Sequence, residues 1–491
     1  MSLTDLPSDI LILALQDLSA PGLAAVSLSC KSIHTLVEEF GWNGHLRSNP
    51  RPALSVAKAQ AQWAPRRIAR YNALSDRAWS RADFTARPLS RPWSGKFQPA
   101  MAISPSRLVV AAGSILYSYK FAVASPSDLE SPSVVFEGSV RLADVPSAVY
   151  DITCLTFIDD GGLDQTLCAG YHGGEAERVI LIPPDEAKNM PLAVVRFPLP
   201  YQRQSDTEFL ESLEFANNRL LSLSSTGVAT LSTVPISPND EVASSSIDIK
   251  QRSWTSHLSL ASSSPFVAFG TSSTTPLTVY SIQPDCISPA PSVNLCMTRR
   301  HIGHEGPAFS SAVYGISRAP PCSVWGASDN VLVSGWYDGQ VRIYDLRADD
   351  RPAVSESSTT TLAPVLSVLD PWSYEPIYDV ACGGGSGTHI AAGSARHSVV
   401  SFWDVRSPQC GWSVYAPGND SSPVYSVILE GSRLFGATQS RPFVYDFGPD
   451  VKNDTYPSLP DVPGADGLKG KKGAGYQVVK YKHNRGVPNG Y

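Results

Sequence analysis

The 491 residues lack most features that mark a specialised protein class. No apolar run approaches the 18 residues that would suggest a membrane span, and the N-terminus shows no basic segment followed by an apolar core, as a secretory signal would. The formal net charge of −6 gives no general case for nucleic-acid binding. The eight cysteines include no C-x-x-C pair, which is typical of idle thiols in a reducing compartment. We therefore expect a cytoplasmic or nuclear protein, or one found in both, without a membrane segment.

Recognisable enzyme motifs are also missing. The glycine-rich stretches at 383–387 and 470–475 lack the helix and the Ser/Thr that follow in a phosphate-binding loop, and there is no nucleophile elbow. The segment HIGHEG at 301–306 has two histidines three residues apart, whereas a zinc-binding helix needs them four apart, and its two glycines indicate a loop. We therefore expect no enzyme, no metal and no cofactor.

Turn-forming residues are abundant instead, with 40 prolines and 36 glycines. The clearest unit is Val331–Arg347, in which two runs with alternating apolar residues flank Asp338-Gly339. This dipeptide favours a hairpin turn, because glycine tolerates a positive φ and aspartate bonds to its own backbone. The stretch predicts two half-buried strands, which need neighbours because an isolated hairpin is marginal in water.

Weaker copies of this hairpin recur along the chain. They begin near Leu108, Leu167, Leu220, Phe266, Ile390 and Leu434. Most have a further strand before them, at Ile152–Phe157, Leu210–Phe215, Ser256–Leu260, Val313–Ser317, Ile377–Ala381 and Val424–Leu429. Multistranded repeats about 50 residues apart indicate an all-β propeller. We predict about seven blades over residues 97–448, although the loose register is also compatible with six or eight.

The first 46 residues have a different pattern. Apolar residues at helical spacing follow Leu6-Pro7, and Pro21 restarts a second helix, so we predict three short helices in this unit. Three such helices form a thin core, and the first is apolar on more than one face. We therefore expect part of the unit to contact a partner.

Residues 47–96 form a basic segment, with eleven Lys and Arg against two acidic residues. Helices are predicted over Ala53–Trp63, ended by Pro65, and over Arg66–Trp79. Aromatic residues are interleaved with the arginines: Trp63, Tyr71, Trp79 and Trp93. Such a pattern occurs in nucleic-acid-binding segments, but Arg stems and Trp rings more often cover the apolar surface of a neighbouring domain. We favour a helical linker of the second kind.

The N-terminal pattern resembles an F-box. The matching positions are Leu6, Pro7, Asp9, Ile10, Leu11, Leu15, Leu18, Leu23, Val26, Cys30, Lys31 and Leu36. Ile33 departs from the family pattern, in which tryptophan is common at this position. The resemblance implies that the unit docks on the Skp adaptor of a cullin-based ubiquitin ligase. By position, the adaptor contacts fall to Leu6, Pro7, Ile10, Leu11 and Leu15.

The hairpin repeats resemble WD repeats, because three of them end in an aromatic residue followed by aspartate. These pairs are Tyr344-Asp345, Trp403-Asp404 and Tyr445-Asp446. The resemblance maps a structural tetrad of side-chain hydrogen bonds onto His304, Ser334, Asp338 and Tyr344. It also places the hairpin turns and the loops before the inner strands on one rim, the usual partner face.

Arginine and aromatic residues on this rim are candidate substrate contacts. They are Arg299, Arg300, Trp336, Tyr337, Arg396, His397 and Arg441. Both residue types are favoured at interfaces, and clustered arginine suits an acidic or phosphorylated peptide.

Together the resemblances imply an all-β seven-bladed WD-type β-propeller preceded by a small all-α F-box domain and a helical linker. Such an F-box/WD-repeat protein is the substrate receptor of an SCF-type (Skp–cullin–F-box) ubiquitin ligase, which catalyses nothing itself but holds a target protein near the conjugating enzyme. One alternative is a propeller scaffold outside any ligase, capped by the N-terminal helices. Another is a propeller enzyme, which would need a metal or pocket chemistry that the sequence does not show. Residues 449–491 are predicted to be a largely disordered tail, in which Tyr476–Tyr481 can still pair as a strand.

Overall fold

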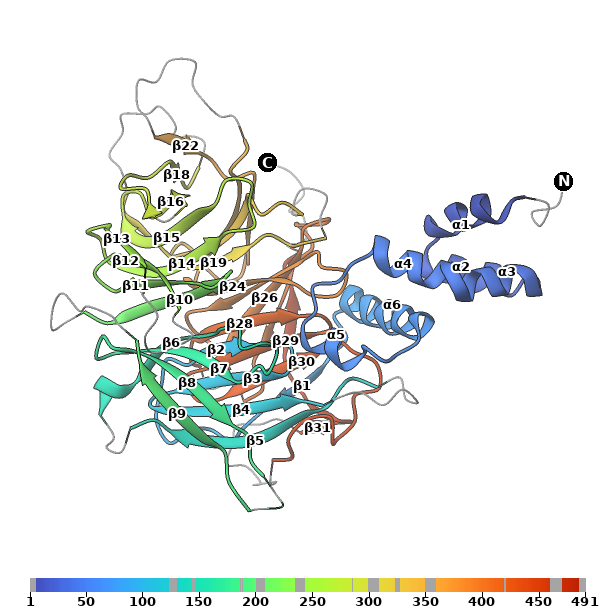
Figure 1. Cartoon of the computed structure of the whole chain (residues 1–491), viewed down its shortest axis with the longest axis horizontal. Helices are drawn as coiled ribbons and strands as arrows, with labels where there is room; N and C mark the ends of the chain where they lie inside the picture. The colour runs from blue at the N-terminus through green and yellow to red at the C-terminus, as the bar shows by residue number, and fades with distance from the viewer. Residues whose placement is uncertain are drawn as a thin grey trace.

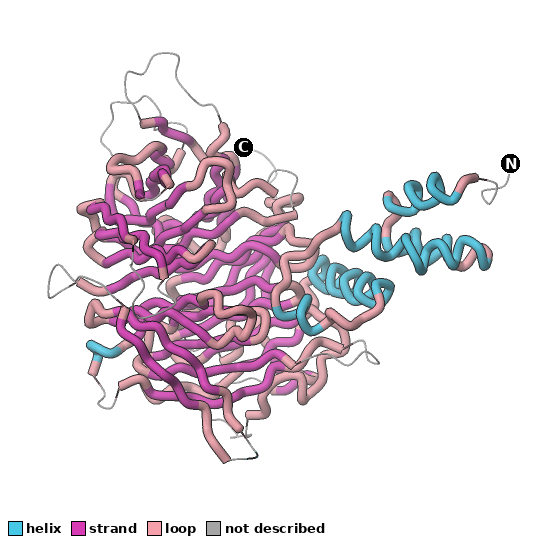
Figure 2. Tube along the Cα trace, viewed as in Figure 1, coloured by secondary structure: helices cyan, strands magenta, loops and turns pink. Residues whose placement is uncertain are grey.

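The computed structural model describes residues 6–122, 130–143, 147–185, 187, 189–199, 208–234, 243–284, 286–298, 309–322, 327–348, 359–418, 421–459 and 470–484. The described chain is mostly β-structure, and nearly all of its helices lie at the N-terminal end, where they project from the sheets (Figures 1 and 2). In these ranges no helix is both long and apolar enough to cross a membrane.

The N-terminal helices largely follow the predicted pattern. They are α1 (Ser8–Gln16), α2 (Ala20–Ser27), α3 (Lys31–Leu36), a π-helical turn (Val37–Gly41), α4 (Trp42–Ser48), α5 (Ser55–Ala59) and α6 (Pro65–Arg81). The helix predicted over Ala53–Trp63 is shorter than expected, because only α5 is helical there. Leu23 of α2 is buried in a core that includes Ala69 of α6, so the α1–α4 unit is packed on the linker helix.

The described strands form sheets that follow one another along the chain, and their pairings are antiparallel with one exception, the parallel pair of Val293–Leu295 with Thr360–Leu362. The first three contain β2 (Ala100–Ile103), β3 (Arg107–Ala112), β4 (Ile115–Phe121) and β5 (Val134–Arg141); β6 (Ile152–Phe157), β7 (Thr166–Tyr171), β8 (Ala176–Ile182) and β9 (Ala193–Pro198); and β10 (Leu210–Ala216), β11 (Arg219–Ser224), β12 (Val228–Thr233) and β13 (Ser244–Asp248). Two further groups are joined through β15 and β19: β14 (Ser253–Ser259), β15 (Phe266–Ser273), β16 (Leu277–Gln283), β17 (Cys286–Ile287) and β18 (Val293–Leu295) with β22 (Thr360–Leu362); and β19 (Ser311–Arg318), β20 (Val331–Trp336), β21 (Gln340–Asp345) and β23 (Leu366–Leu369). The last two contain β24 (Ile377–Gly383), β25 (His389–Ser394), β26 (Val399–Asp404) and β27 (Trp412–Tyr415) with β33 (Lys480–Lys482); and β28 (Val424–Glu430), β29 (Arg433–Thr438) and β30 (Pro442–Asp446) with β1 (Thr85–Pro88).

These sheets are arranged as in a WD-type propeller. Their inner strands contact one another in the cyclic order β2, β6, β10, β14, β19, β24 and β28, and β28 contacts β2 again. The ring closes through β1, which pairs antiparallel with β30 so that Ala86 lies opposite Tyr445. The predicted helical linker of residues 47–96 is therefore wrong in its last part, because the chain from Thr85 is an edge strand and then extended.

The hairpin predicted at Val331–Arg347 is confirmed as β20 and β21, with Asp338-Gly339 in its turn. Gly339 has a φ of +77°, and a Cβ there would lie 2.9 Å from the carbonyl oxygen of Glu375. Glycine is therefore required at this position for its conformation and for its lack of a side chain.

The predicted half-burial of these strands is wrong, because all of β20 is buried. Val333 belongs to a core cluster with Val380 of β24, whereas Leu332 belongs to a cluster with Phe266 of β15. Alternate residues of β20 thus pack against the two neighbouring sheets. In a ring of sheets both faces of each sheet are covered, so alternation of apolar residues no longer indicates a solvent-exposed face.

The tail predicted to be largely disordered is partly ordered. Tyr456 is buried, and β33 adds a fifth strand to the sheet of β24–β27, with Tyr481 opposite Ser413. The Tyr481 hydroxyl donates to Asp370 Oδ2 at 2.7 Å. The strand expected at Tyr476–Tyr481 is therefore present but shifted, and the short β31 (Lys471–Lys472) and β32 (Gly475–Tyr476) precede it.

Candidate functional site

Six inner strands carry a β-bulge at the same position. In each case, one residue near the start of the inner strand has no partner in the next strand of the sheet. A β-bulge leaves such a residue unpaired and turns its side chain away from the ladder. The skipped residues are Thr153, Glu211, Trp254, Tyr314, Tyr378 and Tyr425. They lie at the end of the ring's central channel that faces the hairpin turns. We call this end of the channel the mouth.

Aromatic rings form a continuous arc at the mouth. The ring centroids of Trp254 and Tyr314 are 4.9 Å apart, those of Tyr314 and Tyr378 are 5.4 Å apart, and those of Tyr378 and Tyr425 are also 5.4 Å apart. Tyr337, in the β20–β21 turn, lies 6.4 Å from Tyr314. The four bulge aromatics are half-buried and Tyr337 is exposed. Aromatic residues in such a setting are strong interface anchors, so the mouth is the candidate functional site.

Charged groups of the rim are paired with one another. Arg252 donates to Glu211 Oε1 at 2.9 Å, and its guanidinium lies 3.7 Å from the centre of the Trp254 ring. His397 Nε2 lies 3.4 Å from Glu375 Oε1. The Arg252–Glu211 pair thus offsets two of the charges that the rim would otherwise present to a partner.

Two carboxylates lie deeper in the channel. Burial raises the pKa of Glu214 on β10 to about 7, and the negative charge of Asp379 on β24 adds to the effect. Burial also raises the pKa of Asp379 to about 7, although its carboxylate accepts the N–H groups of Val380 and Val427. The charge of Asp379 acts on Glu214 although β10 and β24 are not neighbours in the ring, which indicates that the two groups face each other across the central channel.

Glu214→Gln should flatten the pH dependence of stability. A carboxyl whose pKa is raised by folding stabilises the protein below its unfolded pKa, about 4.3, and this contribution is lost as pH rises through its folded pKa near 7. The unchanged protein should therefore lose stability between pH 5 and 8, and the variant should lose less and melt higher at pH 8. Thermal unfolding across this range measures the effect, with the exposed Glu175→Gln as control. Parallel pH profiles for the variant and the unchanged protein would contradict the assignment.

Three of the predicted rim contacts lie at the surface. Tyr337 is 58% exposed, and Arg396 and His397 are exposed in the β25–β26 turn. Arg299 and Arg300 lie outside the described residues.

Two other predicted contacts are wrong. Trp336 is fully buried, and its indole Nε1 donates to Ser334 Oγ at 2.8 Å. Arg441 is also buried, beneath Gly418. Trp336 is still part of β20, and the β29–β30 turn is covered by the loop after β27, so neither side chain reaches the rim.

The predicted tetrad is not assembled as a single network among the described residues. Ser334 Oγ donates to the carbonyl of Arg342, and Asp338 accepts from the Arg342 guanidinium at 2.9 and 2.6 Å. The Tyr344 hydroxyl instead donates to the backbone carbonyl of Cys296 at 2.9 Å. His304 lies outside the described residues. Arg342, which the sequence reasoning did not single out, therefore connects the strand and the turn.

The bulge aromatics were also missed, although a sequence signal exists. Three inner strands share a four-residue pattern, in which a β-branched residue is followed by tyrosine, any residue and a second β-branched residue. The pattern occurs at Val313–Ile316, Ile377–Val380 and Val424–Val427. Aligning the repeats on this pattern places the tyrosines at one position of the propeller.

The α1–α4 unit presents a second exposed surface. Of the predicted adaptor contacts, Pro7 is exposed and Leu6 is half-buried. Ile10 is 46% exposed, and Leu13, which was not predicted, is 59% exposed one helical turn further along α1. This surface is apolar and has no neighbour among the described elements of the propeller.

The structure corrects the assignment of two adaptor contacts. Leu11 and Leu15 are buried, because they lie on the face of α1 that packs against the π-helical turn and α4. Leu15 belongs to the apolar core of the helical unit, which its burial stabilises.

The helices are fixed to the propeller at a buried junction. The Glu430 carboxylate, at the end of β28, accepts the N–H groups of Leu54 and Ser55 at 2.7 and 2.9 Å, and its other oxygen accepts the Ser55 hydroxyl at 2.6 Å. Arg51 and Asp76 form a bidentate ion pair at 2.5 and 2.6 Å. These contacts limit rotation of the helices relative to the ring.

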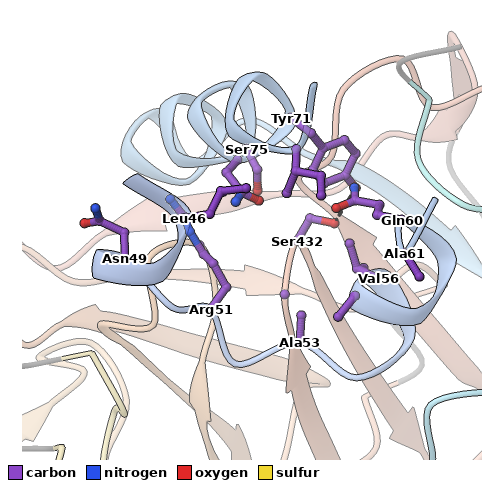
Figure 3. Close-up of a pocket in the computed structure, with 15 residues that line it drawn as sticks. Leu46, Asn49, Arg51, Ala53, Val56, Gln60, Ala61, Tyr71, Ser75 and Ser432 are labelled. Carbon is purple, nitrogen blue, oxygen red and sulfur yellow. Dashed lines mark hydrogen bonds between the residues drawn. The ribbon is translucent and has the colours of Figure 1, made fainter. Parts of the chain in front are cut away.

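A cavity of about 240 Å³ lies inside this junction, between α4, α5, α6 and the turns after β24 and β28 (Figure 3). The Tyr71 hydroxyl bonds to Ser432 Oγ at 2.8 Å at its edge, and burial raises the pKa of Tyr71 to about 12. The buried Gln60 Nε2 and Ser75 Oγ have no hydrogen-bond partner within the described ranges.

Glu430→Ala should lower the free energy of unfolding by about 2–3 kcal/mol, because buried hydrogen bonds to a charged group contribute about this much. The variant should also make residues 47–64 more sensitive to protease. Chemical unfolding and limited proteolysis measure the two effects. The exposed Glu39→Ala should change stability by no more than about 0.5 kcal/mol, and equal losses in both variants would contradict the role of Glu430.

Trp79 covers part of the propeller, as the sequence predicted for the linker aromatics. The Trp79 ring stacks on Phe447 with centroids 3.6 Å apart and also contacts His389 at 4.6 Å. Trp63, Tyr71 and Trp79 are buried, so they cannot stack on the bases of a nucleic acid.

Among the described residues, no group of three or more His, Cys, Asp or Glu side chains could hold a metal ion. The segment at 301–306 lies outside those residues.

Neither a protein-family model nor a curated protein matches this chain. Solved structures do: Sqt1 from Chaetomium thermophilum, bound to the N-terminus of the ribosomal protein L10, is 12% identical with a TM-score of 0.46 and covers 71% of this chain and 83% of that chain. A second structure of Sqt1 is 11% identical with a TM-score of 0.45, covering 71% and 82%. The computationally designed Ika8 protein is 15% identical with a TM-score of 0.41, covering 73% and 99%. These TM-scores are too low to support an argument, so the propeller fold is assigned from the strand pairing within the chain itself.

Proposed function

We propose that this chain is the substrate receptor of an SCF-type ubiquitin ligase, acting in the cytoplasm or nucleus. The α1–α4 unit, as an F-box, would dock on the Skp adaptor and through it on the cullin, and the mouth would bind the target protein. The receptor would supply no catalytic group; it would raise the effective concentration of the target near the conjugating enzyme.

The observation that carries the proposal is the separation of two exposed surfaces on one chain. The helices are attached at Glu430, at one end of β28, whereas Tyr425 of the mouth lies at the other end of the same strand. Five residues of extended strand correspond to about 17 Å. The mouth thus faces away from the helices and is free to receive a partner while the helices engage the adaptor.

We further propose that the propeller has seven blades. Two observations support this number. The inner strands contact one another in a closed cyclic order, and the closing sheet combines β28–β30 with β1, a strand from the N-terminal side of the propeller. A closing strand from the N-terminal side holds the ring shut and thereby keeps the mouth in one shape.

The adaptor surface provides the test. Full-length protein should bind purified Skp-type adaptor, and Ile10→Asp with Leu13→Asp should weaken binding by at least about a hundredfold, because charges would be buried without partners. Calorimetry measures the affinity. Val195→Asp, at a similarly exposed apolar residue of β9, is the matched control.

Absence of adaptor binding by the unchanged protein would sink the proposal. Adaptor binding without ubiquitin transfer to any bound target in a reconstituted ligase would favour the alternative, a propeller scaffold outside a ligase.

A further inference from the structure

The mouth combines half-buried aromatic rings with two carboxylates in the channel beneath them. We propose that it receives a basic side chain of the target protein, a lysine or an arginine, with the cation between the rings and above the carboxylates. This inference rests on the proposed function, since it names the kind of target segment that the propeller would hold.

The aromatic arc provides the first attraction. A cation is stabilised within about 6 Å of the centroid of an aromatic ring. The mouth already contains one such contact, Arg252 over Trp254 at 3.7 Å. Tyr314, Tyr378 and Tyr425 continue the arc and are only half-buried, so a long side chain of a partner can lie against them.

The carboxylates of the channel provide the second attraction for a cation. Glu214 has no hydrogen-bond partner among the described residues, and Asp379 accepts two backbone N–H groups at 2.8 Å. Two carboxylates that share a channel repel each other, and an incoming cation would be attracted to both.

An acidic or phosphorylated target, which the predicted arginines suggested, fits less well. Arg252 is paired with Glu211, Arg342 is buried and paired with Asp338 at 2.6 Å, and Arg441 is buried. Of the predicted rim arginines that the structure describes, Arg396 alone is exposed. Among the residues that the structure describes, the mouth therefore offers fewer free arginines to an acidic target than the sequence indicated.

Selection of random peptides about twelve residues long against immobilised full-length protein tests the proposal. We expect the enriched peptides to share a lysine or arginine. In fluorescence polarisation, such a peptide should bind Glu214→Gln and Tyr378→Ala at least about tenfold more weakly than the unchanged protein. Replacing the shared basic residue of the peptide by norleucine should have a similar effect, whereas Glu175→Gln should not change the affinity.

Enrichment of acidic peptides, of peptides without a shared basic residue, or of none at all would overturn the proposal, as would binding that both variants leave unchanged. Glu214→Gln is expected to be more stable than the unchanged protein at pH 8, so weaker binding by this variant would not reflect unfolding. The two proposals fail separately. Adaptor binding without basic-peptide binding contradicts this inference, and the reverse contradicts the ligase role.

Discussion

Asp446→Asn is expected to lower the free energy of unfolding by about 3–5 kcal/mol, because it leaves a buried guanidinium without its counter-charge. The side chains of Arg433 and Asp446 are both inaccessible to solvent, and Arg433 Nε lies 3.4 Å from Asp446 Oδ2. The Tyr456 hydroxyl donates to the same oxygen at 2.6 Å, and Ser131 Oγ donates to Oδ1 at 3.2 Å. Asparagine keeps the size of the side chain but removes the charge and one acceptor oxygen, so the loss would report the ion pair and its hydrogen bonds rather than a cavity.

The location of this ion pair explains why the effect should be global. Asp446 ends β30 in the closing sheet, Ser131 precedes β5 in the first sheet, and Tyr456 belongs to the segment after the propeller. The Arg433 guanidinium also donates to the carbonyl of Pro132. The network therefore joins the two ends of the ring.

The chain offers a matched control at Asp345, which follows an aromatic residue in the same way as Asp446. It pairs with Arg347 at 2.8 Å, but the Arg347 side chain is 50% exposed. Exposed pairs contribute little, so Asp345→Asn should cost no more than about 1 kcal/mol. Urea unfolding followed by tryptophan fluorescence measures both variants. Equal losses would show that the burial of the Arg433–Asp446 pair does not matter.

The hairpins of the propeller could be predicted because their signals are local. A dipeptide such as Asp338-Gly339 fixes a turn, and the apolar residues beside it fix the strands. The pairing of β1 with β30 could not be predicted, because Thr85–Pro88 is short, basic and ends in proline, and its pairing depends on where the ring brings it. The same holds for β33, which lies on the outer edge of a sheet beside β27.

The site was only partly predictable for a related reason. The sequence predicts that the hairpin turns share one rim of the propeller. Which side chain reaches that rim depends, however, on the last residue of each strand. A bulge near the start of an inner strand redirects one residue, and no single repeat shows this. Comparison of the repeats at Tyr314, Tyr378 and Tyr425 would have shown it, because the bulge position is the same in each.

Substitutions at the adjacent residues Trp336 and Tyr337 should have opposite effects on stability and on binding. Trp336→Ala should cost about 3–5 kcal/mol of stability, because a large buried ring leaves a cavity. It would also remove the support of Arg342, whose guanidinium lies 4.7 Å from the centre of the Trp336 ring. Tyr337→Ala should change stability by no more than about 0.5 kcal/mol, because its ring is 58% exposed.

Binding should show the opposite order. Tyr337→Ala should weaken binding of a selected basic peptide several-fold, because its ring lies 6.4 Å from Tyr314 at the mouth. Trp336→Phe, which keeps most of the buried volume, should retain both fold and peptide affinity. Urea unfolding and fluorescence polarisation measure the two properties in each variant. If Trp336→Phe lost affinity while remaining as stable as the unchanged protein, Trp336 would have to act at the surface, as the sequence alone suggested, and the buried position would not represent the binding-competent state.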